Sequence, residues 1–251
     1  MNDIELLNNK TKRAPVLFCV DTSKSMDILL PGDNITGTGQ YVLNEAGTEQ
    51  IEIGAGGKSY LEATNEKIAE FLSLVSSNAK TKYRVDISVV KFGETIEQVC
   101  DFAPAQNINL NGELDIPSGT SNLCEAISCS LELIKNRYKQ YEEMSIQSYP
   151  SRIIILTDGE ITDENKLMRI KSVISGLSKK LKPFVYIVSI SNNISSLFKI
   201  KEATEGEIIP FTKDNFERFF SFIINSVSVH PNEKGQYNPR DMVRISGNTS
   251  R

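Results

Sequence analysis

Apolar segments of strand length alternate with amphipathic segments along most of this 251-residue chain. Continuous apolar runs bounded by polar residues predict strands that are buried on both faces. These runs lie at 15–21, 83–93, 152–159, 183–190 and 207–211. Between the runs, apolar residues recur three or four positions apart, which is the spacing of one helix face. The helices predicted in this way span 60–79, 122–141 and 167–181, with shorter ones around Leu197 and from Asp214 onward.

This alternation predicts an α/β fold. Strand–helix–strand units join parallel strands through right-handed crossovers, so we expect a doubly wound, mostly parallel central sheet with helices on both faces. The segment EQVCDF at 97–102 follows a tight turn near Gly93 and is expected to be one antiparallel edge strand.

Several polar residues and one proline are expected to mark the ends of helices. Ser59 is the expected N-cap of the helix at 60–79. Asp163 and Glu164 are expected to cap the helix that follows them, and Pro183 is expected to lie just beyond its end.

Composition divides the chain into an N-terminal arm at 1–13, one domain at 14–229 and a flexible, Gly/Pro/Asn-rich tail at 230–251. The domain is interrupted at 27–58 by an insertion rich in Gly, Thr and Asn. Within the insertion, QYVL and QIEI flank NEAGTE, which predicts a small hairpin. Loops of this length inside compact domains are often functional.

Charge and hydropathy exclude some classes of partner. The net charge is −4 without a basic stripe, which argues against nucleic-acid binding. No apolar run approaches the roughly 20 residues of a membrane span, so no membrane association is expected. The first thirteen residues lack the basic-then-apolar order of a signal peptide, and we therefore expect a cytoplasmic protein.

The residues that could serve as a catalytic nucleophile or base argue against an enzyme. The four cysteines form no CxxC pair and are expected to be buried apolar residues rather than zinc ligands or disulfides. The one histidine, His230, lies in the polar tail. Ser-His or Cys-His catalysis therefore has almost no residues to use.

The stretch FCVDTSKSMD contains the most informative chemistry, because a buried strand ends there on Asp21, followed by Ser23 and Ser25. Carboxylate and hydroxyl oxygens are hard ligands that suit Mg²⁺, with Mn²⁺ or Ca²⁺ as further possibilities. One loop cannot supply six oxygens. Thr120 in SGTSN and Asp158 in ILTDG are candidates for the same site, since ligands bind beyond the carboxyl ends of parallel strands.

These three motifs, VDTSKSM, SGTSN and LTDG in that order, resemble the metal-ion-dependent adhesion site of von Willebrand factor A (VWA) domains. That pattern is DxSxS, a later threonine, and an aspartate in a TDG-type turn. The resemblance covers roughly 14–229 without the insertion. Within the family, the chain most resembles the bacterial VWA proteins of tellurium-resistance operons.

The resemblance implies a function. In such sites the two serines and the threonine bind the metal, the aspartates bind it directly or through water, and an acidic residue of a partner protein completes the shell. It thus implies a non-enzymatic adaptor or scaffold in a bacterial stress or signalling system, with a kinase-like or phosphatase protein as a possible partner. The insertion departs from the pattern, and its region offers Asp27, Asp33 and Glu45 as alternative acidic ligands.

Other interpretations of the same residues stay open. Asp21, Ser23, Ser25, Thr120 and Asp158 are each common in caps and turns when taken alone. The segment EIGAGGKSY suggests a P-loop over Gly54–Ser59, although Glu52 stands where the first glycine of GxxxxGK[ST] belongs. A phosphatase with Asp21 as nucleophile needs a second aspartate at the position of Ser23.

Overall fold

The protein is described by a computed structural model. It covers 11–29, 57–79, 81–110, 112, 114, 119–159, 161–178, 181–190, 194–210 and 218–224, and the backbone alone of 36–43 and 50–55. Six strands form one sheet in the order β5-β4-β1-β6-β7-β8. They are β1 (Ala14–Asp21), β4 (Val85–Phe92), β5 (Ile96–Pro104), β6 (Arg152–Thr157), β7 (Phe184–Ser189) and β8 (Glu207–Pro210). All neighbours are parallel except β5, which runs antiparallel to β4 at one edge. The predicted fold class is confirmed.

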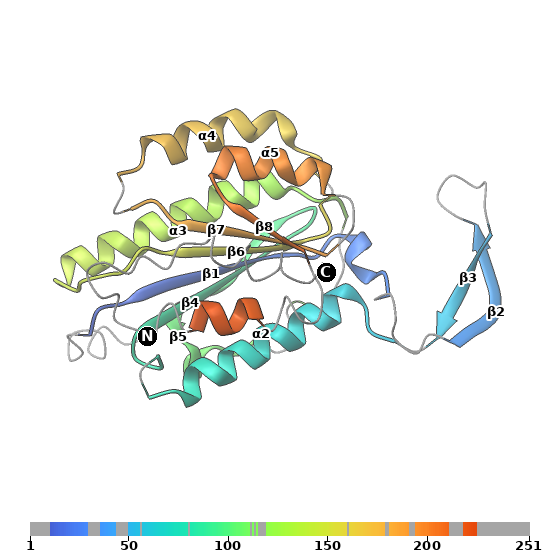
Figure 1. Ribbon diagram of the computed structural model, residues 1–251, viewed down its shortest axis with the longest axis horizontal. Helices are drawn as coiled ribbons and strands as arrows, with labels where there is room; N and C mark the ends of the chain where they lie inside the picture. Colours follow the sequence, from blue (N-terminus) through green and yellow to red (C-terminus); the bar gives the residue numbers. More distant parts are fainter. Residues whose placement is uncertain are drawn as a thin grey trace, which may run out of the picture.

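Helices cover both faces of the sheet (Figure 1). One face is covered by α2 (Tyr60–Ser77) and by the helical residues 218–224. The other face is covered by α3 (Leu123–Glu143), α4 (Leu167–Gly176) and α5 (Ser195–Thr204). Three short 3₁₀ turns complete the described helical segments: η1 (Lys24–Asp27), η2 (Ala105–Asn107) and η3 (Glu164–Lys166).

β1 lies at the centre of the sheet because both of its faces are apolar. Phe18 belongs to the core under α2, where its ring centroid lies 5.2 Å from that of Phe71 and 6.1 Å from that of Phe220. Leu17 and Cys19 belong to the core under α3. Side chains alternate between the two faces along a strand, so a continuous apolar run fills two cores at once.

The strand order puts a topological switch point between β1 and β6. From β1 the chain passes to β4 on one side, and it later returns to β6 on the other side. In sheets of this kind the crevice beyond the carboxyl ends of these two strands is the usual ligand site. Asp21 is the last residue of β1, and Asp158 directly follows β6.

The ends of two helices test the capping predictions. Ser59 caps α2 as predicted: its hydroxyl accepts from the Glu62 amide at 3.1 Å, and the Glu62 carboxylate accepts from the Ser59 amide at 2.8 Å. The helix predicted over 167–181 ends earlier, at Gly176, because glycine is a weak helix former and Leu177 takes an extended conformation. Pro183 therefore does not terminate it.

The predicted hairpin of the insertion is also present. β2 (Thr36–Leu43) pairs antiparallel with β3 (Gln50–Ala55) in a sheet of their own. An antiparallel bridge between Leu29 and Ser59 closes the base of the insertion, and the Tyr60 amide donates to the Ile28 carbonyl at 3.0 Å.

A buried ionic cluster lies at the amino ends of β1 and β4, the end of the sheet opposite Asp21. Asp86 is fully buried and accepts from Arg13 Nη1 at 3.1 Å and from Arg137 Nη2 at 3.0 Å. The Tyr141 hydroxyl donates to the same carboxylate. Arg13, the last residue of the predicted arm, is thus buried and joined to the domain.

Asp86→Ala is expected to lower the free energy of unfolding by about 3–5 kcal/mol, because it leaves two buried guanidinium groups without their carboxylate. Denaturation by urea measures this. Glu97→Ala is the control: it removes an exposed ion pair with Lys91, 3.2 Å long, and should cost less than about 0.5 kcal/mol. Equal effects of the two substitutions would contradict the assignment of Asp86 as a buried anchor.

Candidate metal centre

The first loop of the candidate site winds around the carboxylate of Asp21. The Ser23 amide donates to Asp21 Oδ1 at 2.9 Å, and the hydroxyls of Ser23 and Ser25 are hydrogen-bonded to each other at 3.1 Å. Met26, in η1, is fully buried and fixes this loop to the core under α2. Asp21, Ser23 and Ser25 therefore lie together, as the sequence predicts.

The loop before α3 and the last residue of β6 reach the second oxygen of Asp21. Thr157 Oγ1 donates to Oδ2 at 2.6 Å, and Ser121 Oγ donates to the same atom at 3.0 Å. Thr157 comes beside Asp21 because β1 and β6 are paired in register, with Val20 opposite Leu156. Three segments that are far apart in the sequence thus meet at one buried carboxylate.

The remaining two predicted ligands, Asp158 and Thr120, lie at the same end of the sheet. Asp158 is 9% exposed, and its negative charge acts on Asp21. Thr120 is exposed and directly precedes Ser121. In the described part of the chain Thr120 donates no hydrogen bond to the other four predicted ligands. The structure therefore brings four of the five together and places Thr120 beside them, facing solvent.

A glycine shapes the loop that carries Thr120. Gly119 has φ +55°, and a Cβ there would lie 2.5 Å from Glu94 Cβ, so a larger residue would be both strained and crowded. The Asn122 side chain donates to the Glu94 carbonyl at 3.0 Å, which fastens the loop to the β4–β5 turn. The Lys24 amide donates to the Gly119 carbonyl at 3.4 Å, which places this loop next to η1.

Asp163 has a different role from the one predicted. Its two carboxylate oxygens accept from the amides of Cys124 and Glu125, each at 2.9 Å, so it caps α3 and makes no side-chain cap at its own helix. Thr162 Oγ1 donates to the Ser121 carbonyl at 2.7 Å. The prediction was wrong because free amides at a helix start donate to any carboxylate that the tertiary structure brings to them. These contacts join the loop after Asp158 to the loop carrying Thr120.

Sequence reasoning missed Ser121 and Thr157. Each directly neighbours a predicted ligand, Thr120 or Asp158, and each donates to Asp21. The sequence signal for both was a hydroxyl-bearing residue beside the predicted ligand: Ser121 beside Thr120, and Thr157 beside Asp158. Strand register determines that Thr157 donates to Asp21, and the path of the loop before α3 determines the same for Ser121; both become visible only in the folded protein.

The electrostatics of the site favour a bound cation. Burial raises the pKa of Asp21 from 3.8 to about 6, hydrogen bonds from Ser23 and Thr157 oppose this rise, and the charge of Asp158 adds to it. Ionised Asp21 thus carries a cost of about 3 kcal/mol at neutral pH in the metal-free protein. A cation between the two carboxylates would remove both the repulsion and part of the desolvation cost.

The donor set fits a hard cation only when the hydroxyls are included. In the part of the chain that the structure describes, no three His, Cys, Asp or Glu side chains converge on one point. A metal bound here must therefore take hydroxyl oxygens from Ser23, Ser25 or Thr120 in addition to the carboxylates. Mg²⁺ and Ca²⁺ accept such oxygens.

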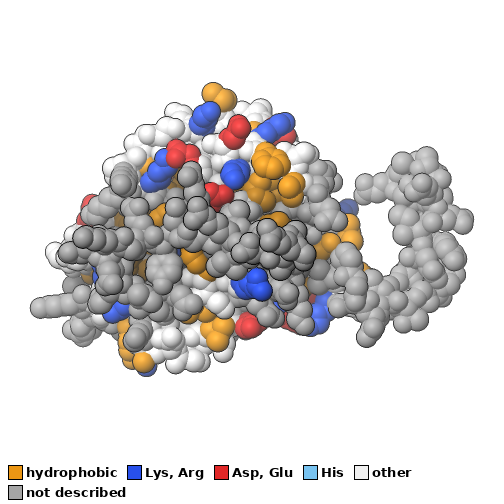
Figure 2. Space-filling model, in the orientation of Figure 1, with side chains coloured by type: hydrophobic (Ala, Val, Ile, Leu, Met, Phe, Trp, Pro, Cys, Tyr) orange, Lys and Arg blue, Asp and Glu red, His pale blue; other side chains and the backbone are white. Residues whose placement is uncertain are grey.

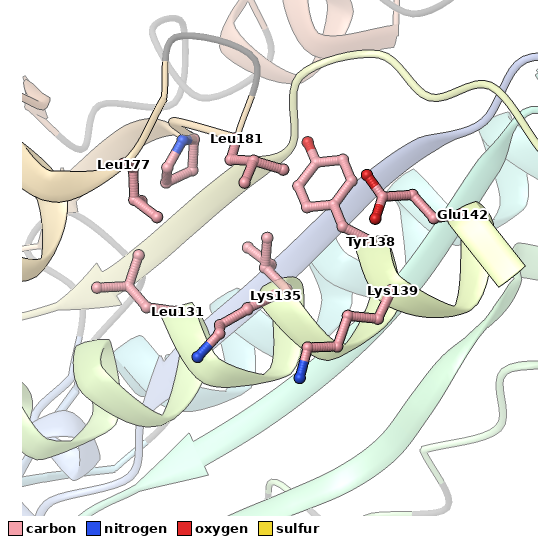
Figure 3. A pocket seen from close by; sticks show the side chains of 9 residues that line it. Leu131, Lys135, Tyr138, Lys139, Glu142, Leu177 and Leu181 are labelled. Atoms are coloured by element: carbon pink, nitrogen blue, oxygen red, sulfur yellow. The ribbon is translucent and has the colours of Figure 1, made fainter.

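Two hollows lie elsewhere on the surface. An apolar groove of about 230 Å³ runs between α3 and the segment after α4, lined by Leu131, Tyr138, Leu177 and Leu181 (Figure 3). A polar hollow of about 510 Å³ is lined by Asp27, Lys58 and neighbouring α2 residues. Of the acidic alternatives Asp27, Asp33 and Glu45, only Asp27 falls in the described residues, where it is exposed on η1.

Positive and negative side chains are mixed on the surface of the described residues. On the face in Figure 2, basic and acidic side chains lie among each other over α4 and α5. Lys199 of α5 forms an ion pair with Glu164 of η3 at 2.7 Å. None of the described helices is both long and apolar enough to span a bilayer.

The similarity of this chain to known proteins lies in its three-dimensional structure. No protein-family model and no curated sequence matches the chain. The PilB minor pilin from Streptococcus sanguinis gives a TM-score of 0.59 at 15% identity, over 94% of this chain and 64% of the pilin. An aerotolerance-related membrane protein from Bacteroides fragilis gives 0.52 at 13% identity, over 84% of this chain and 98% of that protein. A von Willebrand factor type A protein from Catenulispora acidiphila gives 0.52 at 12% identity, over 87% and 43%.

These likenesses define the class of fold. The six-stranded sheet with one antiparallel edge and helices on both faces is a VWA-like α/β fold. The chain spans less than two thirds of the pilin and less than half of the Catenulispora protein. At such identities the similarity concerns the fold alone.

Asp21→Asn is expected to stabilise the metal-free protein, because it removes a buried charge while keeping the shape of the side chain. The native state binds the Asp21 proton more tightly than the unfolded chain, so stability falls as pH rises from 3.8 toward about 6. The gain from Asp21→Asn should therefore be about 1–3 kcal/mol near pH 7.5 and should shrink near pH 4. Denaturation in EDTA at both pH values measures it, and a variant less stable than wild type near pH 7.5 would contradict the account.

Thr157→Val removes the hydroxyl that donates to Asp21 Oδ2 at 2.6 Å. The unfolding free energy of the metal-free protein should drop by about 1–2 kcal/mol near pH 7.5, since a buried carboxylate loses a donor. Thr157→Ser keeps the hydroxyl and should lose clearly less. Equal losses in the two variants would assign the effect to packing of the methyl group instead.

Proposed function

We propose that the protein is a divalent-metal-dependent, non-enzymatic protein-binding module. Its metal, Mg²⁺ or alternatively Mn²⁺ or Ca²⁺, is held by Asp21, Ser23, Ser25, Thr120 and Asp158. One observation carries the proposal: the fully buried Asp21 sits at the switch point of the sheet and is surrounded by hydroxyls from the loop after β1, the loop before α3 and the last residue of β6. The five-residue resemblance to the VWA adhesion site supports the same assignment.

The residues present suit different roles toward the ion. Asp21 already accepts three hydrogen bonds, from the Ser23 amide, Ser121 and Thr157, so it has little remaining capacity and is suited to act through one lone pair or through water. The paired hydroxyls of Ser23 and Ser25 are suited to direct binding. Asp158 supplies the second negative charge, which balances a divalent cation.

The solvent-facing side of this site is where a partner would bind. Hydroxyl and carboxylate ligands on one rim leave other positions of a six-coordinate ion to water. An Asp or Glu of a partner protein can replace such a water and gain a charge-assisted contact. The resemblance to tellurium-resistance VWA proteins favours a cytoplasmic role in a bacterial stress or signalling system, with a kinase-like or phosphatase protein as partner.

The nucleotide-binding alternative has less support. A P-loop follows a strand of the parallel sheet, whereas β3, which precedes Gly57 and Lys58, belongs to the separate two-stranded sheet. Lys58 Nζ is paired with Glu66 Oε2 at 2.6 Å, and the Ser59 hydroxyl caps α2. Loss of ATP binding in Lys58→Ala would favour the alternative, and absence of ATP binding in the wild type would exclude it.

Calorimetric titration with Mg²⁺ and Mn²⁺ tests the metal site. We expect saturable binding of one ion, weakened about tenfold or more by Thr120→Ala and abolished by Asp21→Ala, because each removes an oxygen ligand or its support. Thr95→Ala, in the exposed β4–β5 turn, is the matched control and should bind as wild type does.

Partner binding is tested by affinity capture in Mg²⁺ and in EDTA. Proteins retained by the wild type in Mg²⁺ should be released by EDTA and should not be retained by Thr120→Ala. Retention that is indifferent to both EDTA and Thr120→Ala would remove the metal from the function.

A further inference from the structure

The β2–β3 hairpin stands away from the α/β body. Figure 1 shows it beyond the end of the sheet where Asp21 lies, connected through the chain on either side of the Leu29–Ser59 bridge. Within the described part of the chain, β2 and β3 form hydrogen-bonded pairs only with each other. The outer edge of each strand therefore presents a row of backbone N–H and C=O groups.

An isolated two-stranded ribbon is marginal in water, and a third strand or a packed face is needed to stabilise it. Proteins usually protect open edges with lysine, proline or bulges. The segments TGTGQYVL of β2 and QIEIGA of β3 contain no lysine, arginine or proline. The hairpin thus lacks the lysine and proline that often protect an edge from pairing with another chain.

The two edges differ in regularity. The register of the hairpin shifts between Gly37 and Tyr41, where four steps along β2 correspond to the two steps from Gly54 to Glu52 along β3. The extra residues therefore belong to β2, and a bulge of this kind disrupts the edge that carries it. β3 keeps an uninterrupted run over its six residues.

We propose that the outer edge of β3 pairs antiparallel with the same edge of a second copy of this chain, which gives a four-stranded sheet in the order β2-β3-β3-β2. Antiparallel pairing of identical strands is self-complementary about a two-fold axis, so one edge suffices to close the dimer. A two-fold axis at Ile53 sets this residue opposite its own copy and each Glu52 opposite Gly54 of the other copy, so two like charges do not face each other. Because each hairpin projects from its α/β body, the α/β bodies of the two copies would lie on opposite sides of the four-stranded sheet.

The dimer is expected to be weak. Pairing along one six-residue strand buries well under the roughly 1,000 Å² of a stable interface, so dissociation should fall in the micromolar range. The pairing involves no residue of the candidate metal centre. It is therefore independent of the proposed function, and EDTA should leave it unchanged.

Light scattering coupled to size exclusion tests the proposal on the full chain from about 5 to about 200 µM. We expect a concentration-dependent dimer in the wild type. A variant in which residues 30–58 are replaced by a short Gly-Ser linker should be a folded monomer, since the Leu29–Ser59 bridge already holds the two ends side by side. A monomeric wild type over the whole range, or a dimer that survives removal of the hairpin, would overturn the proposal.

Proline substitutions identify the pairing edge. Neighbouring residues of a strand direct their amides to opposite sides, so one of Glu52→Pro and Ile53→Pro removes an outward N–H while the hairpin keeps its own ladder. That variant should be monomeric. Thr38→Pro, in the irregular part of β2, is the matched control and should remain dimeric. Dimerisation that survives in both β3 variants would overturn the assignment to β3.

Discussion

A buried carboxylate that has no counter-cation among the described residues is the constraint on which the candidate site depends. Asp21 ends a strand that is apolar on both faces, so its side chain lies where water is scarce. Its two oxygens are satisfied by one amide and two hydroxyls, contributed by the loops after β1 and before α3 and by the last residue of β6. Hydrogen bonds reduce the cost of this charge, and the pKa of about 6 shows that they do not remove it.

Asp86 shows the alternative arrangement of a buried aspartate in the same sheet. It lies at the opposite ends of the strands and is neutralised by Arg13 and Arg137, with a hydroxyl from Tyr141. Both carboxylates are fully buried, yet within the described part of the chain only Asp86 has guanidinium partners, while the negative charge of Asp158 acts on Asp21. The difference separates an anchor that holds the fold from the site for which we propose a bound cation.

Local patterns predicted much of the fold, because burial on both faces and helical spacing are directly visible in the apolar positions. The central strands, the antiparallel edge and the Ser59 cap all follow from residues that are neighbours in sequence. The predictions that were wrong concern tertiary contacts. Asp163 caps α3 across 39 positions, and α4 ends at Gly176 although Leu177 and Leu181 continue its apolar spacing. The grouping of four predicted metal ligands could be anticipated from strand order, whereas the donors Thr157 and Ser121 depend on strand register and on the path of the loop before α3.

The proposed function depends on a cation bound between the loop after β1, the loop before α3 and the end of β6. The most direct measurement is an anomalous difference map from crystals of the protein grown with Mn²⁺. The account predicts one strong peak in contact with hydroxyl oxygens of Ser23 and Ser25 and close to the carboxylates of Asp21 and Asp158, with water or a neighbouring acidic group on the exposed side. A map in which manganese binds elsewhere, while Asp21 keeps only its hydrogen bonds to Ser23, Ser121 and Thr157, would contradict it.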